Sequence, residues 1–335
     1  MIPRGRPFVK GKRNLLHIFV SKDRIELRKG GDFGLRRLRI LCFAAAICLL
    51  LSACGSAAAA ETKGEAPGTP YIMPEFRDAR FHGEAATDCG ALRLDDACLD
   101  QGYVAVLAQS EKRMKFQILS GEETYNYDLP DREAQVFPLN MGSGSYTFRL
   151  MEQIEGTKYA CIWSGSRQVT LEDEFEPFLR PSQMVAYSAS SRCVALTKQL
   201  AESCETDTEL ASAIYEYLVD SIRYDKQKAA TVQSGYLPDP DETLETGKGI
   251  CFDYAALAAA MLRSAGIPCK LITGYVENDV YHAWNCFYLE SQGWVTVQIA
   301  ALPDTWQRVD ITFAAGGMPA GEIQNGSEYT TRFTY

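Results

Sequence analysis

A cysteine at the start of a predicted helix is the first residue in this sequence that could do covalent chemistry. Cys251 follows a flexible turn at Gly247 and Gly249, and good helix formers then run from Ala255 to Leu262. The unpaired N–H groups at a helix N-terminus favour a thiolate, which is the species that attacks a carbonyl carbon. The same N–H groups can hold the oxyanion that forms after attack. The spacing therefore predicts that Cys251 is a nucleophile.

A thiol nucleophile needs a base, and His282 is the histidine that can serve it. The chain holds three histidines, and His17 and His82 both lie far upstream of Cys251. Asp310 stands between two apolar residues in a later strand-like run, where its carboxylate could orient the imidazole and complete a triad. The sequence has few histidines, no CxxC pair and no nucleotide-binding fingerprint. It therefore predicts that the protein uses no metal and no cofactor.

These groups need a helix and several strands to position them. Thr206 and Glu209 fit a capping box, and apolar residues at helical spacing then predict a helix that reaches Tyr224. After the helix of Cys251, strand-like runs cover 269–276, 282–290, 294–300 and 306–313. We therefore expect the cysteine helix to be followed by an antiparallel sheet that carries the histidine.

An upstream region is rich in β-branched and aromatic residues, in short runs separated by turn signals. These runs cover 103–109, 115–120, 124–129, 145–152 and 158–164. Short strands at such regular spacing predict a small antiparallel β-sandwich. The fold class is thus α+β, with a β-rich domain over 71–180 and a catalytic domain over 181–335.

The motifs around these residues resemble those of the transglutaminase-like superfamily. The segment 247–268 has the pattern GxGxCxDYAxLxxxMLRxxGIP; YHAW surrounds His282, and WxxxDxTF surrounds Asp310. The resemblance covers roughly residues 205–315 and is greatest to bacterial secreted or lipoprotein members that carry a β-rich domain before the catalytic one. It implies a papain-like core in which Cys251 is the nucleophile, His282 the base and acid, and Asp310 the orienting group.

One departure leaves the third member of the triad open. In many members of the family the aspartate lies on the strand directly after the histidine strand, and there this chain has Gln298. An amide can orient an imidazole, as the asparagine of the papain group does. We favour Asp310 because a carboxylate stabilises the imidazolium better than an amide does.

Three further residues are weaker candidates for the cleft. Tyr254 and Trp284 flank the cysteine and the histidine, where they could either wall the cleft or belong to the core. Gln233 could donate a hydrogen bond to the oxyanion, as could the backbone N–H of Cys251.

The N-terminal segment predicts export. Residues 1–53 hold 12 Lys/Arg and 3 Asp/Glu, and arginines precede an apolar run that ends before Cys54, as in a secretory signal peptide with a lipobox. We expect lipid on Cys54, a flexible tether over 54–70, and the rest of the chain at the outer face of a bacterial membrane. The alternative is an uncleaved N-terminal anchor. The polar stretch 1–34 suggests a start codon assigned too far upstream.

Charge and cysteines narrow the function further. The chain has a net charge of −9 although residues 1–53 are basic, so its acidic body argues against a nucleic-acid partner. Outside the cell, disulfides are permitted, and Cys89–Cys98, Cys193–Cys204 and Cys269–Cys286 are the pairings we expect first. The oligomeric state stays open.

These features predict a thiol enzyme that acts on amide bonds of proteins or peptides. Cys251 would form an acyl-enzyme, and the acyl group would pass to an amine or to water. The alternatives are a cysteine peptidase or amidase of the cell envelope, and a non-catalytic module that keeps the fold to bind peptide or wall polymer.

Overall fold

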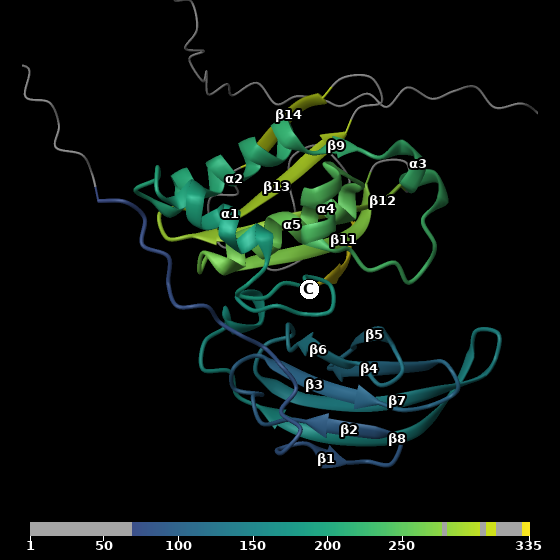
Figure 1. The fold of residues 1–335 in the computed structure, drawn as a ribbon. Helices are drawn as coiled ribbons and strands as arrows, with labels where there is room; N and C mark the ends of the chain where they lie inside the picture. Colours follow the sequence, from purple (N-terminus) through teal and green to yellow (C-terminus); the bar gives the residue numbers. More distant parts are fainter. Residues whose placement is uncertain (1–68, 277–279, 302–305, 313–329) are drawn as a thin grey trace, which may run out of the picture. The chain divides into compact units, whose positions relative to one another are not determined.

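The computed structural model describes residues 69–276, 280–301, 306–312 and 330–335 (Figure 1). The predicted signal peptide (1–53), Cys54 and nearly all of the tether over 54–70 lie outside the described residues. Residues from Pro67 onward form one compact unit.

The first part of the described chain consists of antiparallel strands in two four-stranded sheets. One sheet has the order β1-β2-β3-β6 and the other the order β5-β4-β7-β8. The strands are β1 (Thr87–Asp88), β2 (Leu92–Asp95), β3 (Tyr103–Ala108), β4 (Met114–Ser120), β5 (Glu123–Leu129), β6 (Ala134–Pro138), β7 (Gly144–Glu155) and β8 (Lys158–Val169). All five runs predicted as strands in this region are confirmed.

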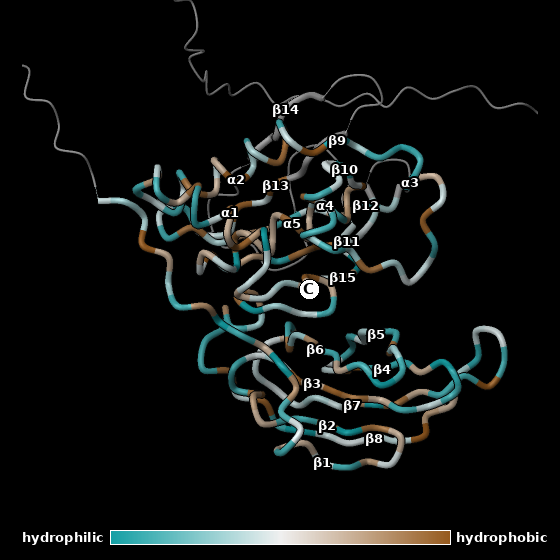
Figure 2. Tube along the Cα trace, viewed as in Figure 1, coloured by the Kyte–Doolittle hydropathy of each residue, from teal (hydrophilic) through white to brown (hydrophobic). Residues whose placement is uncertain are grey.

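Alternation of apolar residues along these strands buries one face of each sheet. In Figure 2 hydrophobic and hydrophilic residues alternate along many of the strands, and in β4 every second residue from Met114 to Ile118 is buried. Phe116 of β4 stacks on Phe137 of β6 with ring centroids 5.3 Å apart, and on Phe148 of β7 at 5.7 Å. Aromatic side chains therefore join the two sheets through a shared core.

Helices follow the strands and surround a central helix. After the short 3-10 helix η1 (Glu176–Phe178) come α1 (Arg192–Ala201), α2 (Asp207–Ser221), β9 (Arg223–Tyr224), α3 (Lys226–Thr231), α4 (Pro240–Thr246), β10 (Lys248–Gly249) and α5 (Cys251–Ser264). The Thr206 side chain accepts a hydrogen bond from the backbone N–H of Glu209, as the predicted cap requires. Helix α2 ends at Ser221, three residues before the predicted end. Helices α1, α2 and α4 all pack on α5.

The last part of the chain forms a five-stranded antiparallel sheet of order β14-β13-β12-β11-β15. Its strands are β11 (Cys269–Val276), β12 (Val280–Leu289), β13 (Gly293–Ala301), β14 (Trp306–Thr312) and β15 (Thr330–Thr334). The first four confirm the predicted strand runs. Helix α5 packs on β11 and β12, so the cysteine helix lies directly on the histidine strand.

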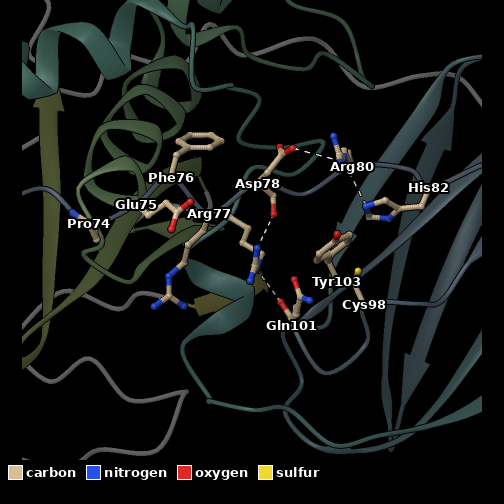
Figure 3. Close-up of a pocket in the computed structure, with 11 residues that line it drawn as sticks. Pro74, Glu75, Phe76, Arg77, Asp78, Arg80, His82, Cys98, Gln101 and Tyr103 are labelled. Atoms are coloured by element: carbon tan, nitrogen blue, oxygen red, sulfur yellow. Dashed lines mark hydrogen bonds and ion pairs between the residues drawn. The ribbon is translucent and has the colours of Figure 1, made fainter.

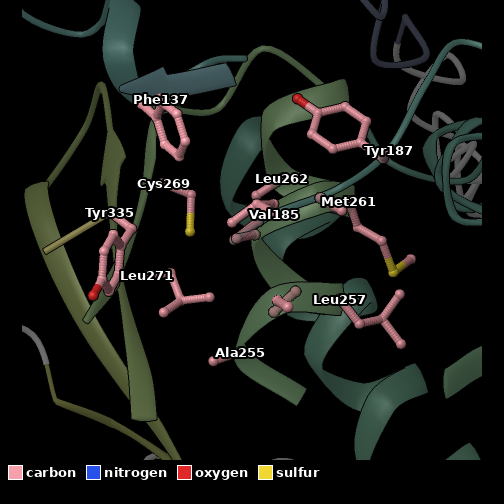
Figure 4. Close-up of a cluster of buried hydrophobic side chains, with 14 of the residues drawn as sticks. Phe137, Val185, Tyr187, Ala255, Leu257, Met261, Leu262, Cys269, Leu271 and Tyr335 are labelled. Atoms are coloured by element: carbon pink, nitrogen blue, oxygen red, sulfur yellow. The ribbon is translucent and has the colours of Figure 1, made fainter. Parts of the chain in front are cut away.

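A buried arginine ties α5 to the segments around it. Arg263 is almost fully buried and donates to the backbone carbonyls of Arg180, Cys269 and Tyr335 at 2.8–2.9 Å. Figure 4 shows Tyr335, Cys269 and Leu271 in the same apolar cluster as residues of α5. The Tyr335 ring also contacts Tyr125 and Tyr127 of β5 at centroid distances of 5.8 and 6.0 Å. The strands of the first part and the later sheet therefore share one core.

The three expected disulfides are wrong, because the cysteines of the described residues are free. Cys193 is the second residue of α1 and Cys204 lies three residues past the end of that helix, so about 12 Å of helical rise up to Ala201 separates the two cysteines, which is beyond the Cα separation of a disulfide. Cys89 and Cys98 are separated by the length of β2.

Cys269 and Cys286 lie on adjacent strands but do not face each other. Cys269 pairs with Phe287 in the register of β11 and β12, and Cys286 pairs with Lys270. Since successive side chains of a strand point to opposite faces, the two thiols lie on opposite sides of the sheet.

Candidate active site

The predicted nucleophile is the first residue of α5. Ile250 is the N-cap residue, and its backbone N–H donates to Oδ2 of Asp253 at 2.8 Å, so the carboxylate closes the first turn of the helix. A side chain at Gly249 would collide with Asp253, because an added Cβ would lie 2.7 Å from the Cβ of that residue. The glycine therefore allows the chain to enter α5 tightly enough for the carboxylate cap to form.

Backbone N–H groups surround the Cys251 thiol. The N–H groups of Ala283, Phe252 and Cys251 itself act on the sulfur and stabilise its thiolate. Burial acts in the opposite direction and is the larger effect, so the pKa of the Cys251 thiol is raised above its ordinary value. The helix N-terminus alone predicts a thiolate. The structure instead holds a protonated thiol at neutral pH, because desolvation outweighs the helix.

The predicted base is also desolvated. His282 lies on β12 directly before Ala283, whose N–H reaches the thiol, and opposite Gly274 of β11. Its Nε2 is buried and has no hydrogen-bond partner among the described residues. Burial lowers the pKa of His282 to about 4. The imidazole is therefore neutral at pH 7 and can accept a proton.

Strand order bears on the third member of the triad. Gln298 and Asp310 are paired with each other between β13 and β14, and β13 is the neighbour of β12 while β14 lies one strand farther. The ladder between β12 and β13 ends at Asn285 and Val297. The backbone therefore places Gln298 nearer to the histidine strand by one inter-strand spacing of about 4.8 Å. The side chains of both candidates lie outside the described residues, so Asp310 stays a prediction.

A buried asparagine joins the nucleophile helix to the histidine strand. Asn285 lies on β12 and is 2% exposed. Its Nδ2 donates to the carbonyl of Ala255 in α5 at 2.9 Å, and its Oδ1 accepts from the hydroxyl of Tyr215 in α2 at 3.2 Å. Asn285 thus fixes the distance between α5 and β12. Sequence reasoning missed this role, although the residue belongs to the HAWN segment that follows His282.

A charged network behind the nucleophile was also missed. Asp253 is fully buried and pairs with Nζ of Lys228 at 2.8 Å and with the hydroxyl of Tyr236 at 2.5 Å. Nζ of Lys228 also donates to the Tyr236 hydroxyl at 2.6 Å. The carboxylate two residues after Cys251 is the signal that could have revealed a cap at this position. Nothing in the sequence indicated its two partners.

The weaker candidates have different environments. Tyr254 is buried in α5, and its hydroxyl donates to the carbonyl of Ile222 at 2.6 Å, which makes it a core residue. Trp284 is also buried, two residues after His282. Gln233 is exposed, and its Nε2 donates to the carbonyl of the nearby Thr231 at 2.7 Å. The donors that the structure places at the thiol are therefore backbone N–H groups.

A hollow in the described part of the chain lies away from Cys251 and His282. A cavity of about 530 Å³ opens between the segment 74–82 and the turn that leads into β3 (Figure 3). Its lining includes Arg77, His82, Cys98, Tyr103 and Arg180. It contains none of the residues predicted to act in catalysis.

The described residues hold neither a metal-binding cluster nor a membrane-spanning helix. Across 69–276 and the shorter described ranges after it, no three His, Cys, Asp or Glu side chains gather in a way that could hold a metal ion. None of the helices in these ranges is long and apolar enough to cross a membrane.

The cysteine at the start of a buried helix, packed on an antiparallel sheet that carries a histidine, is the arrangement that the resemblance in the sequence implied. Residues 194–299 match the family model of the Transglutaminase-like superfamily. This segment is a transglutaminase-like domain.

The similarity to individual relatives extends over a small part of each of those longer proteins. The kyphoscoliosis peptidase of Homo sapiens is 30% identical over 173 residues, which are 47% of this chain and 24% of that protein. The protein-glutamine gamma-glutamyltransferase of Pseudomonas aeruginosa is 27% identical over 120 residues, or 32% of this chain and 18% of that protein. Red sea bream transglutaminase, a solved structure, has 11% identity and a TM-score of 0.29, with 62% of this chain and 49% of that chain covered. This chain thus spans about a quarter or less of its curated relatives named here.

Proposed function

We propose that this protein is a thiol enzyme that acts on amide bonds of proteins or peptides through an acyl-enzyme on Cys251. The observation that carries the proposal is the meeting of α5 and β12. The thiol at the start of α5 receives the N–H of Ala283, the residue next to the desolvated imidazole of His282. A nucleophile, a neutral base and oxyanion donors thus come from two adjoining elements.

The burial of both groups fits general-base activation. His282 takes the thiol proton as Sγ of Cys251 bonds to the carbonyl carbon, and backbone N–H groups hold the oxyanion. The imidazolium then protonates the leaving amine, the C–N bond breaks, and an acyl-enzyme remains. An amine or a water molecule attacks the acyl carbon and gives its proton to His282, the bond between the acyl carbon and Sγ breaks, and the imidazolium returns the proton to the departing sulfur of Cys251. Gln298 or Asp310 would orient the imidazole throughout.

The proposal includes a place in the cell. The apolar segment before Cys54 supports export and lipid attachment, with the folded part held by its tether at the outer face of the membrane. The substrate would then be a protein or peptide of the cell envelope. We propose that the two four-stranded sheets form a β-sandwich that supports the catalytic domain.

The test is to incubate the purified full chain with a glutamine-containing peptide library, with and without a labelled primary amine. We expect mass spectrometry to find either amine incorporation or hydrolysis of an amide bond, and to find the acyl-enzyme on Cys251. Cys251→Ala and His282→Ala should abolish turnover. Turnover that persists in Cys251→Ala would refute the proposal.

A cysteine peptidase is the second candidate function, favoured by the similarity of residues in this domain to a protein named as a peptidase. Backbone cleavage without amine incorporation would select it. If no substrate is turned over but a peptide or wall polymer is bound equally by the wild type and by Cys251→Ala, the chain is a binding module.

A further inference from the structure

We propose that Lys228 is a positioning residue for the nucleophile, because its pairing with buried Asp253 decides how readily the Cys251 thiol ionises. This inference rests on the proposed function, in which Cys251 attacks the substrate. It assigns the network a role in reactivity in addition to its role as a helix cap.

The position of Asp253 creates an electrostatic problem for the thiol. Its carboxylate lies in the first turn of α5, is fully buried and acts on the Cys251 thiol to oppose ionisation. A negative charge so close to a developing thiolate disfavours it, and low exposure to water leaves little screening. The carboxylate that caps α5 therefore lowers the reactivity of the thiol unless a cation offsets its charge.

Lys228 is the cation that the structure places there. Its Nζ lies 2.8 Å from Oδ2 of Asp253, the same oxygen that accepts the N–H of Ile250. Tyr236 completes the set, because its hydroxyl donates to Oδ1 and its ring lies 4.4 Å from the lysine nitrogen. The carboxylate is thus satisfied on both oxygens and neutralised.

The surroundings of α3 indicate that Lys228 is held for its charge. Helix α3 has no buried residue, so packing does not fix it in place. Asp225 caps α3 by accepting from the backbone N–H of Lys228 at 2.8 Å. The side chain of Lys228 contacts Asp253 in the first turn of α5 and Tyr236, which itself binds Asp253.

Other ionisable groups face the same region. His282 of β12 and Tyr224 of β9 lie near the thiol, and Asp239 and Glu242 at the start of α4 act on Tyr236. Burial first, and the Cys251 thiol next, raise the pKa of Tyr224 above its ordinary value, so this phenol carries no charge at neutral pH. Within the pair of Lys228 and Asp253, one substitution can remove the positive charge and another the negative charge. The two substitutions should change the ionisation of the thiol in opposite directions.

The test follows the alkylation of Cys251 in the purified full chain by mass spectrometry across a pH series. The midpoint of the alkylation rate against pH reports the pKa of the Cys251 thiol. Lys228→Met leaves the negative charge of Asp253 without its cation, and we expect this midpoint to rise by on the order of one pH unit. Asp253→Asn keeps the cap acceptor but leaves the lysine unbalanced, so the midpoint should fall by a similar amount. The double variant should return close to the wild-type midpoint, and Lys228→Arg should preserve it.

Lys198→Met on α1 is the matched control, because it removes one exposed lysine and should not move the midpoint. If the pair of Lys228 and Asp253 served stability alone, both single variants would lower the free energy of unfolding and neither would shift the midpoint. That result would overturn the inference. Shifts of the same sign in Lys228→Met and Asp253→Asn would also overturn it. The proposed function is tested separately: a chain without turnover whose midpoints still shift in opposite directions refutes only the enzyme, whereas an active chain with unmoved midpoints refutes only the role of Lys228.

Discussion

The depressed pKa of His282 predicts that stability falls in mildly acidic solution. The pKa is lowered from 6.5 to about 4 because the folded state buries the imidazole, whereas the unfolded chain exposes it. Between pH 6.5 and pH 4 the unfolded state therefore binds a proton that the folded state does not, so stability decreases as the pH falls through this window. The difference between a pKa of 6.5 in the unfolded chain and about 4 in the folded chain corresponds to about 3 kcal/mol of unfolding free energy, which is lost almost entirely between pH 6.5 and pH 4.

Urea unfolding at a series of pH values from 7 to 4 measures this loss. His282→Gln removes the titrating group, so the difference in unfolding free energy between wild type and variant should change by about 3 kcal/mol across the series. Thr206→Ala is the control, because it removes an uncharged cap of α2 and should lower the unfolding free energy equally at every pH. Parallel pH profiles for the wild type and His282→Gln would refute the reasoning that His282 is buried as a neutral base.

Three further variants test the elements around the site. Because Gln298 lies one strand nearer to β12, we expect Gln298→Ala to lower kcat about tenfold or more and at least as far as Asp310→Ala does; loss in Asp310→Ala alone would restore the preference drawn from the sequence. Asn285→Leu should cost about 1–3 kcal/mol in urea unfolding and also lower kcat, since it leaves a buried hydroxyl unpaired and frees α5 from β12; unchanged kcat would limit Asn285 to stability. Thr206→Ala should cost about 1 kcal/mol without affecting kcat, because it removes only the cap of α2.

The sequence was sufficient to predict elements whose local pattern and burial agree. The strand runs before and after α5 alternate or continue their apolar residues as buried strands do, and their observed bounds lie within a few residues of the predicted ones. β15 could not be found in this way. Its residues Thr330–Thr334 are mostly exposed, and pairing with β11, some sixty residues away, makes them a strand.

The same distinction applies to the residues of the candidate site: some are marked by a local sequence motif, and others are brought together only by the folded chain. Cys251 and His282 stand out because motif and helix position mark them. Lys228 and Tyr236 do not, since their role exists only where chain folding brings them to Asp253. The state of the thiol was also beyond local reasoning, because a helix N-terminus favours the thiolate and only tertiary burial reverses that preference.

The three carbonyls that Arg263 binds have a consequence for cooperativity. Its partners Arg180 and Tyr335 lie outside the segment 194–299 that matches the family, so the boundary of the family match cuts through a buried hydrogen-bonding unit. The segment 194–299 on its own would keep the guanidinium but lose two of its acceptors, and a buried cation without acceptors is strongly destabilising. We therefore expect calorimetry of the whole chain to show that the strands of the first part and the later five-stranded sheet melt in a single transition. The segment that the family shares, 194–299, is then shorter than the segment that folds as one unit, which begins at Pro67.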